Sequence, residues 1–168
     1  MEFWDIYDEN RKPKGYTHIR GNEMKPGDFH IVVNVWVRNK KGEYLLTKRT
    51  PNKAWGGYWE CTGGSVVSGE TSRICAVREL AEEAGIEVNP DDGIRIWSYN
   101  RMKLHNQPDF CDVWFFEKDF DISDVVFQEG ETCDAMWASR EKILEMLEND
   151  EFVPMIDYID KVFDYSSK

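Results

Sequence analysis

Apolar residues recur in short runs along the chain, and glycine, proline, asparagine or aspartate separates most of them. Runs that are rich in β-branched and aromatic residues and end at such turn residues are typical of β-strands. The strongest is FHIVVNVWVR at 29–38, which a four-residue turn joins to EYLLTK at 43–48, a pattern that predicts a hairpin. The predicted strands are residues 3–7, 29–38, 43–48, 59–62, 94–100, 112–116 and 135–138.

The segment from about Thr71 to Ala84 has the apolar spacing of a helix. Thr71 or Ser72 can provide the N-cap, and Gly85 is placed to end the helix as a left-handed C-cap residue. One side of this helix is predicted to pack on a sheet through five residues: Ile74, Val77, Leu80, Ala81 and Ala84.

Two further helices are predicted near the C-terminus. Ser139 caps one that runs to about Glu148, and the other spans 154–163. The apolar face of the last helix consists of Met155, Ile159, Val162 and Phe163. Strands and helices in this order predict an α/β fold in which helices cover a sheet. Residues 1–28 are polar and interrupted by proline and glycine, so we predict an N-terminal extension packed on a single domain of residues 29–168.

Length, composition and net charge limit the classes of function that this chain can have. The chain has 168 residues, enough for one domain with a core, and 41% of them are hydrophobic. The formal net charge of −11 argues against broad nucleic-acid binding, which requires a positive surface. An anionic substrate stays open, because a bound divalent cation can reverse the local charge.

Neither a membrane span nor a signal peptide is predicted, since no apolar run is long enough and the N-terminus is polar. The four cysteines lack CxxC spacing, and we interpret them as reduced thiols of a cytoplasmic protein.

Glu79, Glu82 and Glu83 lie close together on the first helix and spread over roughly 100° of its surface. Like charges at this spacing destabilise a helix by a few tenths of a kcal/mol per pair, roughly. A hard divalent cation such as Mg²⁺ would offset that cost. Arg78 is placed to bind a carboxylate with both arms of its guanidinium, either that of Glu70 or that of Glu79. Taken alone, the acidic stretch is more often an ordinary solvated helix face.

The flanking spacing separates these alternatives, because the stretch from residue 64 to 86 resembles the Nudix box. In that pattern a glycine, a glutamate, Arg-Glu, Glu-Glu and a final glycine stand at set intervals. The matching residues are Gly64, Glu70, Arg78, Glu79, Leu80, Glu82, Glu83, Gly85 and Ile86. The resemblance extends over roughly residues 29–150 and implies the Nudix α/β/α sandwich, with a mixed β-sheet between helices.

The resemblance also implies roles for individual residues. Glu79, Glu82 and Glu83 would bind Mg²⁺ together with the carbonyl of Gly63, with Mn²⁺ as the alternative ion. Arg78 would orient Glu79. The catalytic residues would then be Glu79, Glu82, Arg78 and Glu131.

Glu131 lies in an acidic loop where the family often places a metal ligand or a base, and Glu129 competes for that role. Arg49 and Lys53 precede the box and could bind the diphosphate, or could be solvated surface bases. Aromatic candidates for stacking on a substrate are Trp36, Trp55, Tyr58 and Trp114, with core packing as the alternative role.

By this resemblance the protein would hydrolyse a small molecule in which a nucleoside diphosphate is linked to another moiety, or a related diphosphate. Isopentenyl-diphosphate isomerase is one rival, because the lead-in KRTPNKAWGGYWECTGG is similar. That isomerase needs Cys and His where this chain has Gly63 and Ser65, so hydrolysis is favoured. A non-catalytic nucleotide-binding module is the second rival, although no box carboxylate is lost. A homodimer is compatible with the family.

Overall fold

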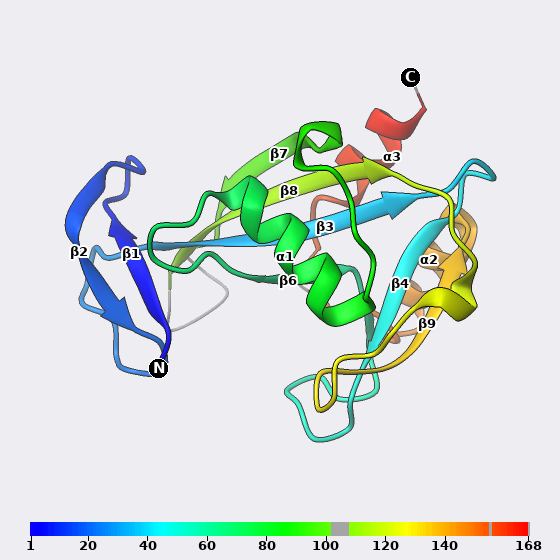
Figure 1. Cartoon of the computed structure of the whole chain (residues 1–168), viewed down its shortest axis with the longest axis horizontal. Coiled ribbons are helices and arrows are strands. Elements are labelled where there is room, and N and C mark those ends of the chain that lie inside the picture. The colour runs from blue at the N-terminus through cyan, green and yellow to red at the C-terminus, as the bar shows by residue number, and fades with distance from the viewer. Residues whose placement is uncertain (102–107, 155, 168) are drawn as a thin grey trace.

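The chain forms a small sheet and a large one, with helices on both faces of the large sheet (Figure 1). The structure is a computed structural model that describes residues 1–101, 108–154 and 156–167. Within these residues, the small sheet pairs β1 (Phe3–Tyr7) with β2 (Pro13–Ile19). The strands of the large sheet are β3 (His30–Arg38), β4 (Tyr44–Arg49), β5 (Trp59–Glu60), β6 (Thr62–Ser65), β7 (Ile94–Asn100), β8 (Asp109–Glu117) and β9 (Thr132–Ala138).

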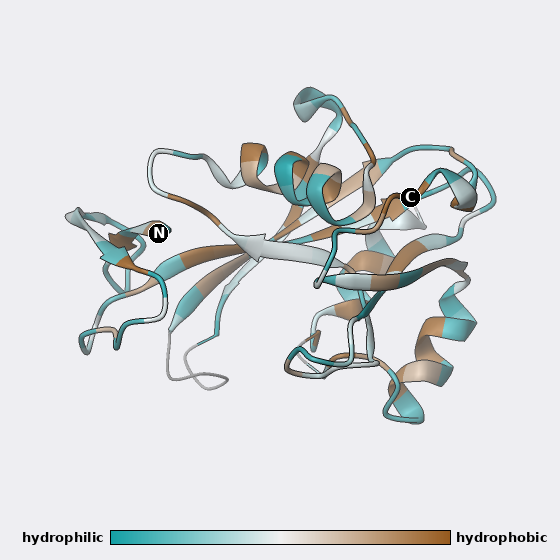
Figure 2. Ribbon diagram, turned by 60° about the horizontal axis from the view of Figure 1, so that its bottom comes forward, coloured by the Kyte–Doolittle hydropathy of each residue, from teal (hydrophilic) through white to brown (hydrophobic). Residues whose placement is uncertain are grey.

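The large sheet is mixed. β3 runs parallel to β8 along its whole length and antiparallel to β4 and β6, while β9 pairs with β4. Both β8 and β9 begin three residues earlier than the sequence pattern predicts. Figure 2 shows that the central strands are hydrophobic, whereas the connecting loops are mostly hydrophilic. This arrangement confirms the predicted mixed sheet.

Helices cover both faces of the large sheet. α1 (Ser72–Ala84) lies on one face, and α2 (Arg140–Glu148) and α3 (Ile159–Ser166) lie on the other (Figure 1). Each face has its own apolar cluster: Leu80 and Ala84 of α1 belong to one, and Ile143 and Phe163 to the other. The predicted α/β/α sandwich is confirmed. Two short 3-10 helices, η1 (Pro90–Asp92) and η2 (Ile122–Asp124), complete the described helices.

The caps of α1 follow the sequence, but its buried face differs from the prediction. Thr71 is the N-cap, and Gly85 ends the helix with φ 68°. Ile74 was predicted to face the sheet but is 47% exposed. Cys75, Ala76 and the charged Glu83 are buried instead. The helix also packs against β6, where glycines allow a close approach, and this turns the carboxylate side of the helix inward.

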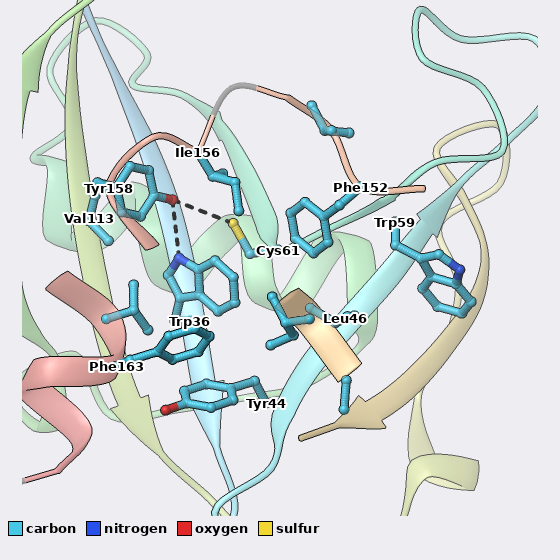
Figure 3. Close-up of a cluster of buried hydrophobic side chains, with 14 of the residues drawn as sticks. Trp36, Tyr44, Leu46, Trp59, Cys61, Val113, Phe152, Ile156, Tyr158 and Phe163 are labelled. Atoms are coloured by element: carbon cyan, nitrogen blue, oxygen red, sulfur yellow. Dashed lines mark hydrogen bonds between the residues drawn. The ribbon is translucent and has the colours of Figure 1, made fainter. Parts of the chain in front are cut away.

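The last helix is shorter than predicted, because α3 begins at Ile159 and not at residue 154. The preceding segment forms tertiary contacts in place of helical ones. Phe152 forms a β-bridge with Trp59. The hydroxyl of Tyr158 accepts hydrogen bonds from Asn34 and from Trp36, the second of which is drawn in Figure 3. Of the predicted apolar face, Ile159, Val162 and Phe163 lie in or against the core, and Met155 lies outside the described residues.

The N-terminal sheet contacts the large sheet through several side chains. The Trp4 ring stacks on His30 with centroids 3.9 Å apart, and Arg11 forms a two-armed ion pair with the buried Asp112. Asp5 accepts hydrogen bonds from the residues just before α1. Strand β2 was not predicted, because Pro13 and Gly15 suggested a turn. No helix in the described ranges is long and apolar enough to cross a membrane.

The stacked His30 should make folding sensitive to acid. Burial lowers the pKa of His30 to about 4, and its Nδ1 has no hydrogen-bond partner among the described residues. The unfolded chain therefore takes up a proton near pH 6.5 that the folded chain resists, so this histidine destabilises the fold as the pH drops. We expect the free energy of unfolding to fall by about 2 kcal/mol between pH 7 and pH 5 because of this group alone.

Urea denaturation at a series of pH values measures this effect. In His30→Gln, which keeps a polar planar group but cannot be protonated, that part of the pH dependence should disappear. An equal slope in both proteins would contradict the prediction.

Candidate active site

Two glycines of β6 lie in tight positions, Gly63 against β3 and Gly64 against Glu79 of α1. Gly63 and Gly64 lie in β6, paired with β3, and not in a loop as the sequence pattern predicts. A Cβ atom at Gly63 would lie 2.6 Å from the carbonyl oxygen of Val33, and one at Gly64 would lie 2.1 Å from Oε1 of Glu79. At Gly63 the neighbour is backbone and cannot easily move, so glycine is needed there, whereas a side chain at Gly64 would require the Glu79 carboxylate to shift.

A hollow of about 560 Å³ lies beside this junction of β6 and α1. Its lining is mainly charged and contains no aromatic residue among those described. The hollow brings together every residue that the sequence predicts for the site: Arg49, Lys53, Gly63, Arg78, Glu79, Glu82, Glu83 and Glu131. Glu129, the competitor of Glu131, is exposed and is not part of the lining.

None of the aromatic stacking candidates reaches this hollow. Trp36 and Trp114 are buried in the two core clusters. Trp55 and Tyr58 contact each other edge to face on the loop after β4.

Arg78 connects the carboxylates of the box. Its Nε and Nη2 atoms donate to the two oxygens of Glu70 at 2.9 and 3.0 Å, in the two-armed geometry. Nη1 donates to Glu79 at 2.8 Å and to Glu82 at 3.1 Å. The sequence left Glu70 and Glu79 as alternative partners, and the structure gives Arg78 both of them. Glu70 also accepts from the backbone N–H of Val67, which joins the loop to the helix.

Glu83 is a buried carboxylate whose burial is offset by little hydrogen bonding. Its side chain is 6% exposed, and the hydrogen bond it accepts among the described residues comes from the N–H of Gly63 at 3.3 Å. Burial, together with the negative charges of Glu60 and Glu79, raises the pKa of Glu83 to about 8. Burial raises the pKa of Glu79 and of Glu60 as well. The hollow therefore disfavours the ionised form of these three carboxyl groups, because water solvates them poorly there.

This donor set fits a hard divalent cation in its chemistry. Carboxylate and carbonyl oxygens are the usual ligands of Mg²⁺, and a cation would relieve the repulsion around Glu83. In the geometry described here, Nη1 of Arg78 binds both Glu79 and Glu82. Within the described ranges, no three acidic, histidine or cysteine side chains are grouped so that they could hold an ion without rearrangement.

The two predicted diphosphate-binding cations lie in ion pairs. Nη1 of Arg49 donates to both oxygens of Glu60, at 2.9 and 2.7 Å, and its Nε donates to the carbonyl of Ala54. Lys53 pairs with Glu131 across the hollow. Burial and the charge of Arg49 lower the pKa of Lys53. To bind Arg49 or Lys53, an anion that enters the hollow must therefore replace the carboxylate with which that cation is paired.

Sequence reasoning missed three residues that bear on the site. Glu60 forms an ion pair with Arg49, and its negative charge contributes to raising the pKa of Glu83. Its place in a strand, one residue from Cys61, offered no signal of this. Glu2 and Arg20 line the hollow from the N-terminal sheet. No local pattern could reveal them, because only the folding of the first 28 residues onto β3 and β6 brings them there.

The contact between Gly64 and Glu79 yields a direct test. In Gly64→Ala the new methyl group displaces the Glu79 carboxylate from its contact with Arg78. We expect about a tenfold loss of Mg²⁺ affinity, comparable to that for other residues that support a metal ligand. Mg²⁺ titration followed by thermal unfolding measures it. Ser65→Ala, next in the same strand, is the matched control, and equal Mg²⁺ affinities in the two variants would refute the role of the close contact.

Comparisons with known proteins agree with the fold and with the resemblance seen in the sequence. A family model described as "NUDIX domain" matches residues 28–158. The chain is 38% identical over 156 residues to an uncharacterized Nudix hydrolase of Listeria monocytogenes, covering 92% of this chain and 89% of that protein. It is 25% identical over 150 residues to the isopentenyl-diphosphate Delta-isomerase of Citrobacter koseri, covering 84% and 80%. A crystal structure from Deinococcus radiodurans shares the fold with TM-score 0.73 and 23% identity, covering 90% and 92%.

Proposed function

Because the chain belongs to the NUDIX domain family, we propose that it is a Mg²⁺-dependent pyrophosphohydrolase acting on a nucleoside diphosphate linked to another moiety, or on a related diphosphate. The observation that carries the proposal is the hollow beside α1. There the carboxylates of Glu79, Glu82 and Glu83 share one lining with Arg49 and Lys53. A diphosphate needs both kinds of group: carboxylates for its metal ion and cations for its phosphate oxygens.

Glu79, Glu82, Glu83 and the carbonyl of Gly63 would hold the metal ion. When bound, Mg²⁺ neutralises charge on the phosphate oxygens and makes a coordinated water more acidic. Mn²⁺ prefers the same oxygen ligands and is the alternative. Loading requires Nη1 of Arg78 to release Glu79 or Glu82, while its two-armed pair with Glu70 can stay in place.

The remaining side chains then have separate tasks. Arg78 orients Glu79. Glu82 and Glu131 are the candidates to accept the proton of the attacking water, since their side chains are 47% and 37% exposed. Arg49 and Lys53 bind phosphate oxygens by exchanging their carboxylate partners for the substrate.

Isomerisation is the rival reaction, and the position of Cys61 argues against it. The thiol is 5% exposed and lies in the cluster on the α2 and α3 face, 3.9 Å from the hydroxyl of Tyr158 (Figure 3). Burial raises its pKa, so the thiol is a poor acid or nucleophile there. At the two positions where the isomerase needs Cys and His, the chain has Gly63 and Ser65.

A screen of Mg²⁺-dependent hydrolysis tests the proposed function. The substrates should include nucleoside diphosphates and triphosphates, dinucleotides, sugar nucleotides and isoprenoid diphosphates, with release of phosphate-containing products as the readout. We expect turnover of at least one class that stops when EDTA removes the metal. If no class is cleaved while nucleotides still bind, the chain is the non-catalytic module.

We further propose that residues 1–28 are an extension of the hydrolase domain at 29–168. Cytoplasmic location and homodimer formation stay predictions.

A further inference from the structure

Arg20 lies just after β2, far in sequence from the box, yet it lines the same hollow as the box carboxylates. The N-terminal sheet lies beyond the start of β3 (Figure 1). Two residues that flank its strands, Glu2 and Arg20, line the hollow. Glu2 directly precedes β1, and its Oε2 pairs with Nη1 of Arg20 at 2.8 Å. The extension therefore adds one cation and one anion to the proposed site.

Arg20 is the most accessible of the cations in the hollow. Its side chain is 58% exposed, against 18% for Arg49, 26% for Lys53 and 28% for Arg78. Its partner Glu2 is itself 34% exposed. Exposed ion pairs of this kind contribute little to stability, so a phosphate can replace Glu2 at small cost. The more buried pairs of Arg49 and Arg78 are harder to exchange.

The backbone at Arg20 is held independently of this ion pair. Its N–H donates to the carbonyl of Glu2 at 3.0 Å, and Trp4 and Arg11 attach the small sheet to the large one. The guanidinium can thus change partner while its attachment point stays in place. Glu2 has a second tie, since one of its oxygens accepts from Nε1 of Trp4.

Three cations of the hollow lie close enough for their charges to interact. The positive charges of Arg49 and Arg20 both contribute to lowering the pKa of Lys53, so the fields of the three cations overlap. None of the described lining residues is aromatic, and Val67 supplies the one large aliphatic side chain among them. Recognition inside this hollow therefore depends on charge and not on base stacking.

We propose that Arg20 binds a phosphate of the substrate outside the diphosphate that is cleaved, in exchange for Glu2. This inference rests on the proposed function and specifies its substrate class: diphosphates that carry at least one additional phosphate. Glu2 acts as the competitor that such a phosphate must displace. A substrate whose distal moiety is neutral gains nothing from Arg20.

Binding of methylene analogues of inorganic diphosphate and triphosphate, which water cannot cleave, tests the proposal. Isothermal titration calorimetry of the full chain with Mg²⁺ should show about tenfold tighter binding of the triphosphate analogue, the contribution of one charge-assisted contact. Arg20→Gln should bring this ratio close to one and leave the affinity for the diphosphate analogue within about twofold. Glu2→Gln, which frees Arg20 and keeps an acceptor for Trp4, should raise the ratio by roughly threefold.

The two substitutions are expected to change the affinity ratio in opposite directions, which distinguishes phosphate binding from a structural role. Damage to the N-terminal sheet would instead weaken binding in both variants. Lys40→Gln is the charge-matched control, because Lys40 is exposed and lies outside the hollow. An unchanged ratio in Arg20→Gln would overturn the inference but leave the proposed function standing. If the wild-type protein binds neither analogue, both are overturned.

Discussion

Glu83→Gln is expected to lower Mg²⁺-dependent turnover by about 10³-fold while making the metal-free protein more stable. Turnover falls because the variant loses one carboxylate of the proposed metal site. Stability rises by about 1 kcal/mol, because the wild-type carboxyl must either be buried as an anion beside Glu60 and Glu79 or take up a proton, and the neutral amide does neither. The amide can still accept the hydrogen bond from Gly63 through its oxygen.

Two measurements check this prediction: urea denaturation in EDTA, and Mg²⁺ titration of thermal stability. The variant should unfold at higher urea than the wild type but gain nothing from Mg²⁺. Glu87→Gln removes an exposed charge just after α1 and should change neither quantity. A Glu83→Gln protein that is less stable in EDTA, or that still responds to Mg²⁺, would show that Glu83 has a structural role only.

Arg78→Met should have the largest effect on stability among the site variants. Its guanidinium serves Glu70, which is 9% exposed, and Glu79, which is 13% exposed. Without it these carboxylates keep their burial but lose their main donors. Breaking such a pair costs about 3 kcal/mol, even though Met preserves the aliphatic packing. Arg78→Lys restores the charge but not the two-armed geometry, so we expect it to recover less than half of the loss.

Urea denaturation of the three proteins gives the free energies of unfolding. Arg73→Met is the matched control, because Arg73 lies on the same helix and its ion pair with Asp91 is exposed. That control should stay within about 0.5 kcal/mol of the wild type. If Arg78→Met matched the control, the guanidinium would not be what holds the carboxylates in place.

Predictions from the local sequence pattern were confirmed where the backbone conformation of a residue depends on its near neighbours in the chain. The caps at Thr71 and Gly85 and the long strand at 29–38 all follow from propensities within a few residues. They failed where distant contacts compete. The apolar spacing at 154–163 suits a helix, but the hydroxyl of Tyr158 is bound by Asn34 and Trp36, and helix forms only from Ile159.

Spacing along the chain was enough to identify the family and to predict which side chains of the box gather at the site. The reason is that the spacing of the glycines, Arg78 and the glutamates is local to one strand, one loop and one helix. The solvation of those groups, and the residues that face them, depend on how the elements pack. Glu83 is buried because α1 packs onto β6, and Arg20 reaches the hollow because the N-terminal sheet docks through Trp4 and Arg11. Burial and long-range approach depend on how elements pack together, and no spacing along the chain encodes that directly.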